Sequence, residues 1–153
     1  GLRGPIHSAE KLVDWFGARR FVVGHTHGAY AQRLLGALAR LGADHAVAVR
    51  GVEGSDVLRP GRPVAVASDG PLELPERLGL MLRGDPDAAT SAELTRAVLA
   101  GDDDGAARAA VVVSAAVRLL AAGTAARPEA AIRHATGAID DGRALATLDA
   151  LVG

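Results

Sequence analysis

The stretch RFVVGHTHGAYAQRLLGALARLGADHAVAVRG, residues 20–51, contains the pattern that decides the fold. A short β-branched and aromatic run at 21–23 ends at Gly24, which is typical of a strand that leads into a loop. Apolar side chains then recur at helical spacing until Gly42 supplies a stop, and a second apolar run occupies 46–49. Strand, helix and strand over about 30 residues predict a βαβ unit with parallel strands and a right-handed crossover.

After this unit the sequence first favours a hairpin and then helices. Residues 57–75 are rich in proline, glycine and single valines, and Asp69-Gly70 has the composition of a hairpin turn. Farther along, Thr90 lies three residues before Glu93, which is the spacing of a helix capping box. Three more alanine-rich stretches follow, bounded by glycine or proline, and each predicts another helix.

Length and composition agree with one α/β domain over residues 1–153, in which a sheet with a βαβ unit carries a C-terminal helical layer. Aromatic residues make up only 3% of the chain, so alanine, valine and leucine must fill the core. The net charge of −1 does not favour nucleic acid as a partner, and the absence of cysteine excludes disulfides and thiolate metal sites. The apolar run at 109–122 is too short to span a membrane and contains Arg118, so we expect a cytoplasmic protein without a membrane partner.

Polar residues follow both predicted strands, at the edge where open α/β sheets bind their ligands. His25 and His27 follow the first strand, but zinc needs three or four ligands and no clear third one accompanies them. We therefore interpret this pair as lining a pocket. Glu53 and Asp56 follow the second strand, where they suit a metal or acceptor site, or form a solvated turn whose residues serve the backbone.

Four stretches, taken in order, resemble a known family. One family segment runs from G-[VI]-R-T through N-x-x-G-P-x-x-N-P to a strand ending in V-G, and its spacing matches GLRGPIHSAEKLVDWFGARRFVVG. A strand with H-G-x-D-G-x-D-E corresponds to AVAVRGVEGSDVL. The helical signatures G-G-x-x-x-x-N-A and N-A-A-A-x-L-x-x-A-G match residues 81–123, and a terminal A-x-x-x-I-x-S-G-x-A matches AIDDGRALATLDALV. The chain thus resembles the C-terminal half of anthranilate phosphoribosyltransferase, and more closely its anthranilate-phosphoribosyltransferase-like paralogues.

The resemblance implies a C-terminal domain like that of phosphoribosyltransferases and nucleoside phosphorylases. It implies a glycosyltransferase related to tryptophan biosynthesis, which moves a phosphoribosyl group from phosphoribosyl pyrophosphate to an aromatic or nitrogenous acceptor. The family binds Mg²⁺ through an Asp-Glu pair, of which Asp56 is kept and Val57 replaces the glutamate. Asp56, helped by Glu53, would therefore hold Mg²⁺ at a weakened site, because hard cations need several oxygen ligands.

The resemblance also assigns an acceptor side. Arg3 is kept where a family arginine contacts the anthranilate carboxylate, although a surface salt bridge is the alternative. His7 stands in place of a family asparagine, where it would bond the acceptor or cap local structure. Arg50 stands where the enzymes have histidine. Together with His25, these residues are the candidates for substrate binding.

Two phosphate-binding segments of the family, G-T-G-G-D and K-H-G-N-R, belong to its N-terminal half and do not occur in this sequence. We therefore expect as partner the N-terminal half of the same protein or another chain, in an oligomer, and whether this chain is an enzyme stays open. The alternative is a non-catalytic paralogue that acts as a nucleic-acid-binding module or as a partner subunit.

Overall fold

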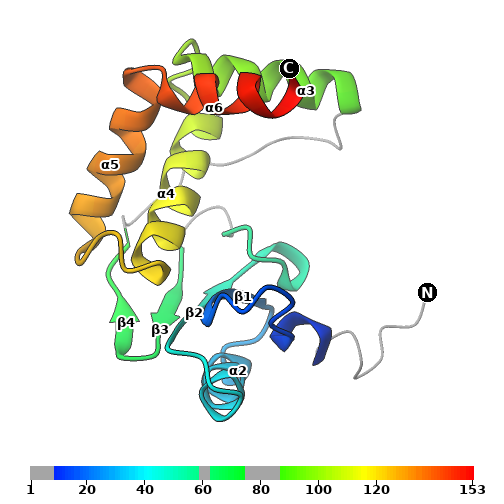
Figure 1. Ribbon diagram of the computed structural model, residues 1–153, viewed down its shortest axis with the longest axis vertical. Helices are drawn as coiled ribbons and strands as arrows, with labels where there is room; N and C mark the ends of the chain where they lie inside the picture. The colour runs from blue at the N-terminus through cyan, green and yellow to red at the C-terminus, as the bar shows by residue number, and fades with distance from the viewer. Residues whose placement is uncertain (1–8, 59–62, 75–86) are drawn as a thin grey trace.

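The computed structural model describes residues 9–58, 63–74 and 87–153, which form a mixed sheet with helices on both faces (Figure 1). The strands are β1 (Arg20–His25), β2 (His45–Arg50), β3 (Ala65–Ala67) and β4 (Gly70–Leu72). The α-helices are α2 (Ala29–Arg40), α3 (Ala88–Ala100), α4 (Ala106–Ala121), α5 (Pro128–Asp140) and α6 (Arg143–Val152). Two single-turn helices, η1 (Glu10–Leu12) and η2 (Val52–Gly54), precede β1 and follow β2.

The predicted βαβ unit is present. β1 and β2 are joined by α2 and pair in parallel, with His25 opposite Arg50 at their carboxyl ends. β3 pairs antiparallel with β2, and β4 pairs antiparallel with β3, which gives the strand order β1-β2-β3-β4. The carboxyl ends of the two parallel strands therefore lie side by side at one end of the sheet.

Side-chain alternation along β2 divides the core into two clusters, because successive residues of a strand face opposite sides of the sheet. All four residues at 46–49 are buried. The two alanines cluster with Leu35 and Leu38 of α2, whereas the two valines cluster with Val113 and Val117 of α4. The central strand is thus covered on both faces, which explains its continuous apolar sequence.

Helix α4 connects the sheet to the helical layer. Its valines contact the sheet, while Ala116 and Leu120 pack with Ala131 of α5. Nearer its N-terminus, Val112 packs with Val98 of α3. Figure 1 shows α3 and α6 beside the end of α4 that is far from the sheet. Within the described ranges, no helix combines the length and apolar character needed to cross a bilayer.

Two local predictions differ from the structure. The hairpin turn consists of Ser68 and Asp69, because Ala67 already pairs with Gly70. The turn therefore lies one residue earlier than the Asp-Gly pair suggested.

The capping box at α3 is also wrong. The N-cap is Asp87, whose carboxylate accepts the backbone N–H of Thr90 at 2.8 Å. Thr90 therefore lies inside the first turn, as the residue that is capped. The C-terminal end of α3 is as predicted, because Gly101 ends the helix with a left-handed backbone (φ 85°).

Candidate functional site

The rim loop, residues 51–57, turns back over the carboxyl ends of β1 and β2. The backbone N–H of Gly51 donates to the carbonyl of His25 at 3.0 Å. The loop closes on itself through a 2.8 Å bond from the N–H of Val52 to the carbonyl of Val57. The Ser55 hydroxyl donates to the carbonyl of Val52 at 2.6 Å. The loop conformation is therefore set mainly by its own backbone bonds.

Close backbone contact explains the glycines of this region. A Cβ at Gly24 would lie 1.8 Å from the Ser55 carbonyl oxygen, and one at Gly51 would lie 1.6 Å from the same atom. Gly54 has a left-handed backbone with φ 80°, and the preceding Glu53 shares that region with φ 51°. Glycine is needed here because the loop lies in backbone contact with both strand ends.

Lys11, in η1, forms hydrogen bonds that hold the rim loop. Its ammonium group donates to the carbonyl of Gly54 and, at 3.5 Å, to the carbonyl of Gly24. These two bonds link the segment before β1 to the end of β1 and to the loop. The sequence offered one signal for this role, because Lys11 is the only lysine of the chain.

Asp56 faces helix α4, where its carboxylate accepts a 2.5 Å bond from the guanidinium of Arg118. The side chains of Arg118 and Asp56 are 48% and 44% exposed. A second guanidinium N–H donates to the carbonyl of Ser114 at 3.0 Å, one turn earlier in α4. Sequence reasoning placed Arg118 in a buried helix and missed this contact, although a charge within an apolar run was visible.

The predicted substrate-binding residues divide into two groups. His25 is buried at the end of β1, with its Nδ1 3.1 Å from the carbonyl oxygen of His27. Arg50 is exposed at the end of β2, opposite His25 in register. The structure therefore brings these two strand ends together at the rim. Arg3 and His7 lie outside the described residues.

The predicted magnesium ligands do not form a metal site by themselves. Glu53 is exposed and Asp56 already accepts a bond from a guanidinium. Over the parts of the chain that the structure describes, no group of three or more His, Cys, Asp or Glu side chains could hold a metal ion. A hard cation takes six or more oxygen ligands, so most would have to come from water or substrate.

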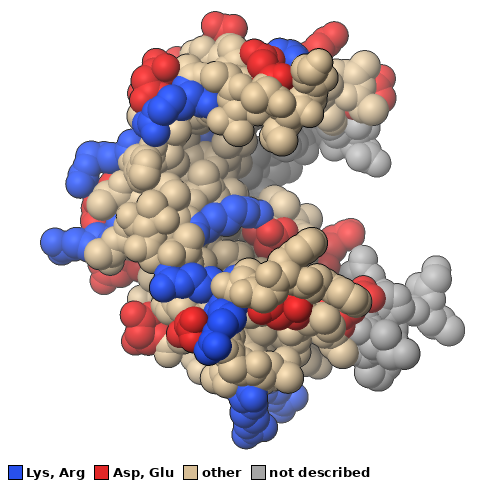
Figure 2. Space-filling model, in the orientation of Figure 1, with Lys and Arg blue, Asp and Glu red and all other residues tan. Residues whose placement is uncertain are grey.

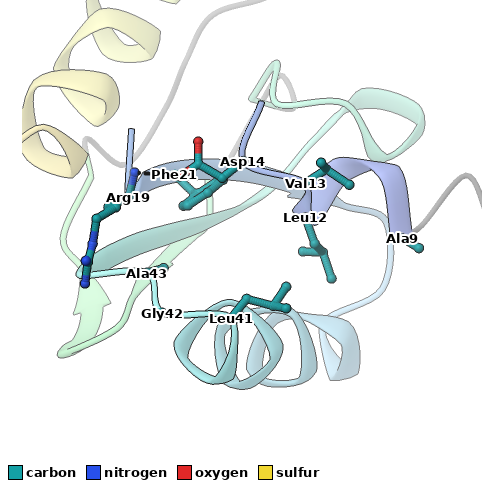
Figure 3. A pocket seen from close by; sticks show the side chains of 9 residues that line it. All are labelled: Ala9, Leu12, Val13, Asp14, Arg19, Phe21, Leu41, Gly42 and Ala43. Atoms are coloured by element: carbon teal, nitrogen blue, oxygen red, sulfur yellow. Dashed lines mark hydrogen bonds between the residues drawn. The ribbon is translucent and has the colours of Figure 1, made fainter. Parts of the chain in front are cut away.

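A cavity of about 520 Å³ lies toward the amino ends of the parallel strands, opposite the rim (Figure 3). Most of its wall is apolar. The lining residues are Ala9, Leu12, Val13, Asp14, Arg19, Phe21, Leu41, Gly42 and Ala43. Figure 3 shows Leu12 and Leu41 approaching the cavity from η1 and from the end of α2. Trp15 and Phe16, next to the lining residues, are 75% and 94% exposed.

Asp14, the acidic residue of this cavity, is used by the local backbone. Its carboxylate accepts N–H bonds from Ala18 at 2.9 Å, Arg19 at 3.1 Å and Phe16 at 3.2 Å. These bonds, that from Ala18 foremost, lower the pKa of Asp14 below its usual value of 3.8. Asp14 therefore holds the turn before β1 rather than presenting a carboxylate to a ligand.

The charges around the rim loop are mixed. Lys11, Arg50 and Arg118 come to it from three different segments, and Glu53 and Asp56 lie within it. Figure 2 shows the same mixture on the whole face that it displays, with basic and acidic side chains interspersed. Such a rim suits a small anionic ligand better than a long phosphate backbone.

Comparison with known proteins gives a consistent result, although no family model matches the chain. Anthranilate phosphoribosyltransferase from Rubrobacter xylanophilus is 36% identical over 154 residues, covering 92% of this chain and 44% of the relative. The enzyme of that name from Pelobacter propionicus is 34% identical over 99% of this chain and 46% of the relative. The chain thus spans about half the length of the curated relatives that it matches.

The fold is similar to that of a solved structure whose name is the same as that of these relatives. The crystal structure of anthranilate phosphoribosyltransferase from Thermus thermophilus is similar with a TM-score of 0.68 and 28% sequence identity. The similarity covers 82% of this chain and 40% of that chain. Sequence and fold therefore point to the same group of proteins.

Proposed function

The chain belongs to the anthranilate phosphoribosyltransferase family, whose C-terminal half it matches, and we propose that it forms the acceptor-side and magnesium-side part of a phosphoribosyl-transfer site. The reaction would displace pyrophosphate from phosphoribosyl pyrophosphate by an aromatic or nitrogenous acceptor. Catalysis of this kind depends on positioning and on stabilising the charge of the leaving group.

The observation that carries the proposal is the rim at the carboxyl ends of β1 and β2. Open α/β sheets bind ligands at this end, and the rim collects polar groups from separate segments there. His25 and Arg50 end the two paired strands, and the rim loop brings Asp56 to the same end. Arg50 is an exposed guanidinium, which suits the carboxylate of an aromatic acceptor. Arg3 and His7 are proposed to complete the acceptor side.

The proposed site needs a partner for the family's two phosphate-binding segments. The matched relatives are about twice as long as the matched segment, and the phosphate-binding motifs of the resemblance do not occur in this sequence. We propose that the N-terminal half of the same protein, or another chain, supplies them. A Mg²⁺ ion held only by Asp56 and Glu53 would be weakly bound and would depend on substrate oxygens.

A chimera tests this proposal. In it, this chain replaces the matched residues of the Rubrobacter xylanophilus relative, and release of pyrophosphate from phosphoribosyl pyrophosphate is measured with Mg²⁺ and a panel of aromatic amines that includes anthranilate. Acceptor-dependent release is expected. Arg50→Ala should lower kcat/KM about tenfold by removing an exposed cation that is proposed to contact the acceptor. Arg40→Ala, at the exposed end of α2, is the matched control and should leave the rate unchanged.

A folded chimera that releases no more pyrophosphate than the relative's N-terminal part alone would refute the proposal. Circular dichroism and a cooperative thermal transition establish that the chimera is folded. The alternative function, a nucleic-acid-binding module, predicts binding that weakens steeply with salt. The net charge of −1 gives that alternative no support.

A further inference from the structure

The ion pair between Asp56 and Arg118 places a permanent cation where the resemblance to the transferases places a metal ion. Asp56 is the carboxylate that the rim loop keeps from the metal-binding motif, and its oxygen lies 2.5 Å from the Arg118 guanidinium. We propose that Arg118 serves as the cation of the rim in place of a divalent metal ion, so that the rim binds a pyrophosphate-type anion without metal. This inference rests on the proposed transfer function, in which it replaces the weakly held Mg²⁺ ion by Arg118.

Helix α4 fixes the position of this cation. The guanidinium is held by the carbonyl of Ser114 at 3.0 Å, one turn earlier on the same helix. The adjacent Val117 is 1% exposed and packs in the core against the sheet. Arg118 is therefore anchored by the rigid part of the fold, whereas Asp56 comes from the loop. An arginine keeps its charge at any accessible pH, so the cation needs no metal supply.

The pair remains reachable by a ligand. Nearly half of each side chain is exposed, and a guanidinium has five N–H donors in a planar fork. The bonds to Asp56 and to the Ser114 carbonyl leave donors that match phosphate oxygens in geometry. Lys11 adds a second positive charge at the rim loop, where it donates to the Gly54 carbonyl.

The same arrangement disfavours a divalent ion. A metal ion at Asp56 would have to displace the guanidinium or lie beside it as a like charge, which raises its free energy of binding. Val57 offers no second carboxylate, and within the described ranges no cluster of three acidic, histidine or cysteine side chains exists. The residues present therefore fit a guanidinium-balanced carboxylate better than a metal centre.

The test is a ³¹P NMR titration of the chain with sodium pyrophosphate, in excess EDTA and then with Mg²⁺. Saturable binding in EDTA is expected, because the proposed site needs no metal ion. Arg118→Ala should weaken binding by about tenfold or more, the usual effect of losing a charged hydrogen bond. Arg96→Ala, which breaks a somewhat more exposed pair with Asp149, is the control and should bind like the wild type.

The variant Asp56→Asn distinguishes a site based on the Arg118 guanidinium from a site based on a metal ion, even if Arg118→Ala fails to fold. It leaves Arg118 in place, so binding in EDTA should persist. Binding that requires Mg²⁺ and is lost in Asp56→Asn would overturn the inference and leave the proposed function intact. Absence of pyrophosphate binding in both conditions would also overturn it. The chimera assay decides the proposed function separately, because it measures transfer and not binding to this chain.

Discussion

The two ends of the parallel strands differ in how they use polar groups. At the carboxyl ends, the rim loop contacts both strands by backbone, and Lys11, Asp56 and Arg118 form bonds between separate segments. At the amino ends, the cavity wall is mostly apolar, and the carboxylate of Asp14 is bonded to the N–H groups of its own turn. Arg19 also pairs with Asp44 across segments at the amino ends, at 2.8 Å. The carboxyl ends are therefore distinguished by the meeting of η1, the rim loop and α4 through Lys11, Asp56 and Arg118.

The largest expected effect tests the tight contact at the rim. Gly51→Ala places a Cβ 1.6 Å from the Ser55 carbonyl oxygen, so loop and strand must separate. We expect a loss of about 2–3 kcal/mol in the free energy of unfolding, measured by urea denaturation. Gly36→Ala is the control, because its Cβ meets nothing within 4 Å and it lies in α2. The control should gain about 0.5–1 kcal/mol, and equal losses in both variants would contradict the comparison.

A smaller effect is expected at the amino end, and it depends on pH. The pKa of Asp14 is lowered in the folded chain, chiefly by the N–H of Ala18 and then by that of Arg19. The folded form therefore binds fewer protons than the unfolded form, and the resulting stability is present above the unfolded pKa. This stabilisation is lost as the pH falls below the unfolded pKa of about 3.8 and then through the lower pKa of the folded chain. Asp14→Asn should flatten this part of a stability curve measured by denaturant from pH 6 to pH 2.

The Asp14 result has a clear contrary outcome. If the acid limb of the curve has the same slope in Asp14→Asn as in the wild type, then the bonds to Ala18 and Arg19 do not hold the turn in solution. The turn before β1 would then be less well held than the bonds of Asp14 imply, and the difference in rigidity between this turn and the rim loop would be larger.

The smallest stability effect is expected at the exposed ion pair. Arg118→Ala removes a half-exposed partner of Asp56, and such pairs contribute about 1 kcal/mol or less. Arg96→Ala in the helical layer should have a similar effect, because its pair with Asp149 is somewhat more exposed. Thermal unfolding of both variants checks this. A much larger loss in Arg118→Ala alone would indicate that the pair is part of the fold and not reserved for a ligand.

Sequence periodicity was sufficient for the βαβ unit and for the helical layer. The continuous apolar run at 46–49 and the stops at Gly42 and Gly101 all reflect local rules that a single segment obeys. The capping box failed because a residue that the sequence analysis did not consider caps the helix. Asp87 lies closer to the start of α3 than Thr90 does, and its side chain reaches the free N–H groups first.

The candidate site was predictable only in part, because its key contacts join segments far apart in the chain. The position of Asp56 at the carboxyl end followed from the strand order, but its partner lies 62 residues later on α4. The bond from Lys11 to Gly54 spans 43 residues. Neither spacing leaves a periodic signal. Only the fold, which places α4 on the sheet, reveals that these charges meet.

Because Lys11 is the only lysine of the chain, lysine-directed chemistry would modify one side chain, which is bonded to the end of β1. β1 is an edge strand of the described sheet, as is β4. Acylation of that ε-amine would abolish its positive charge and detach η1 from two carbonyl oxygens at once. A dye or cross-linker attached there would therefore report on a single place, the contact between the end of β1 and the rim loop.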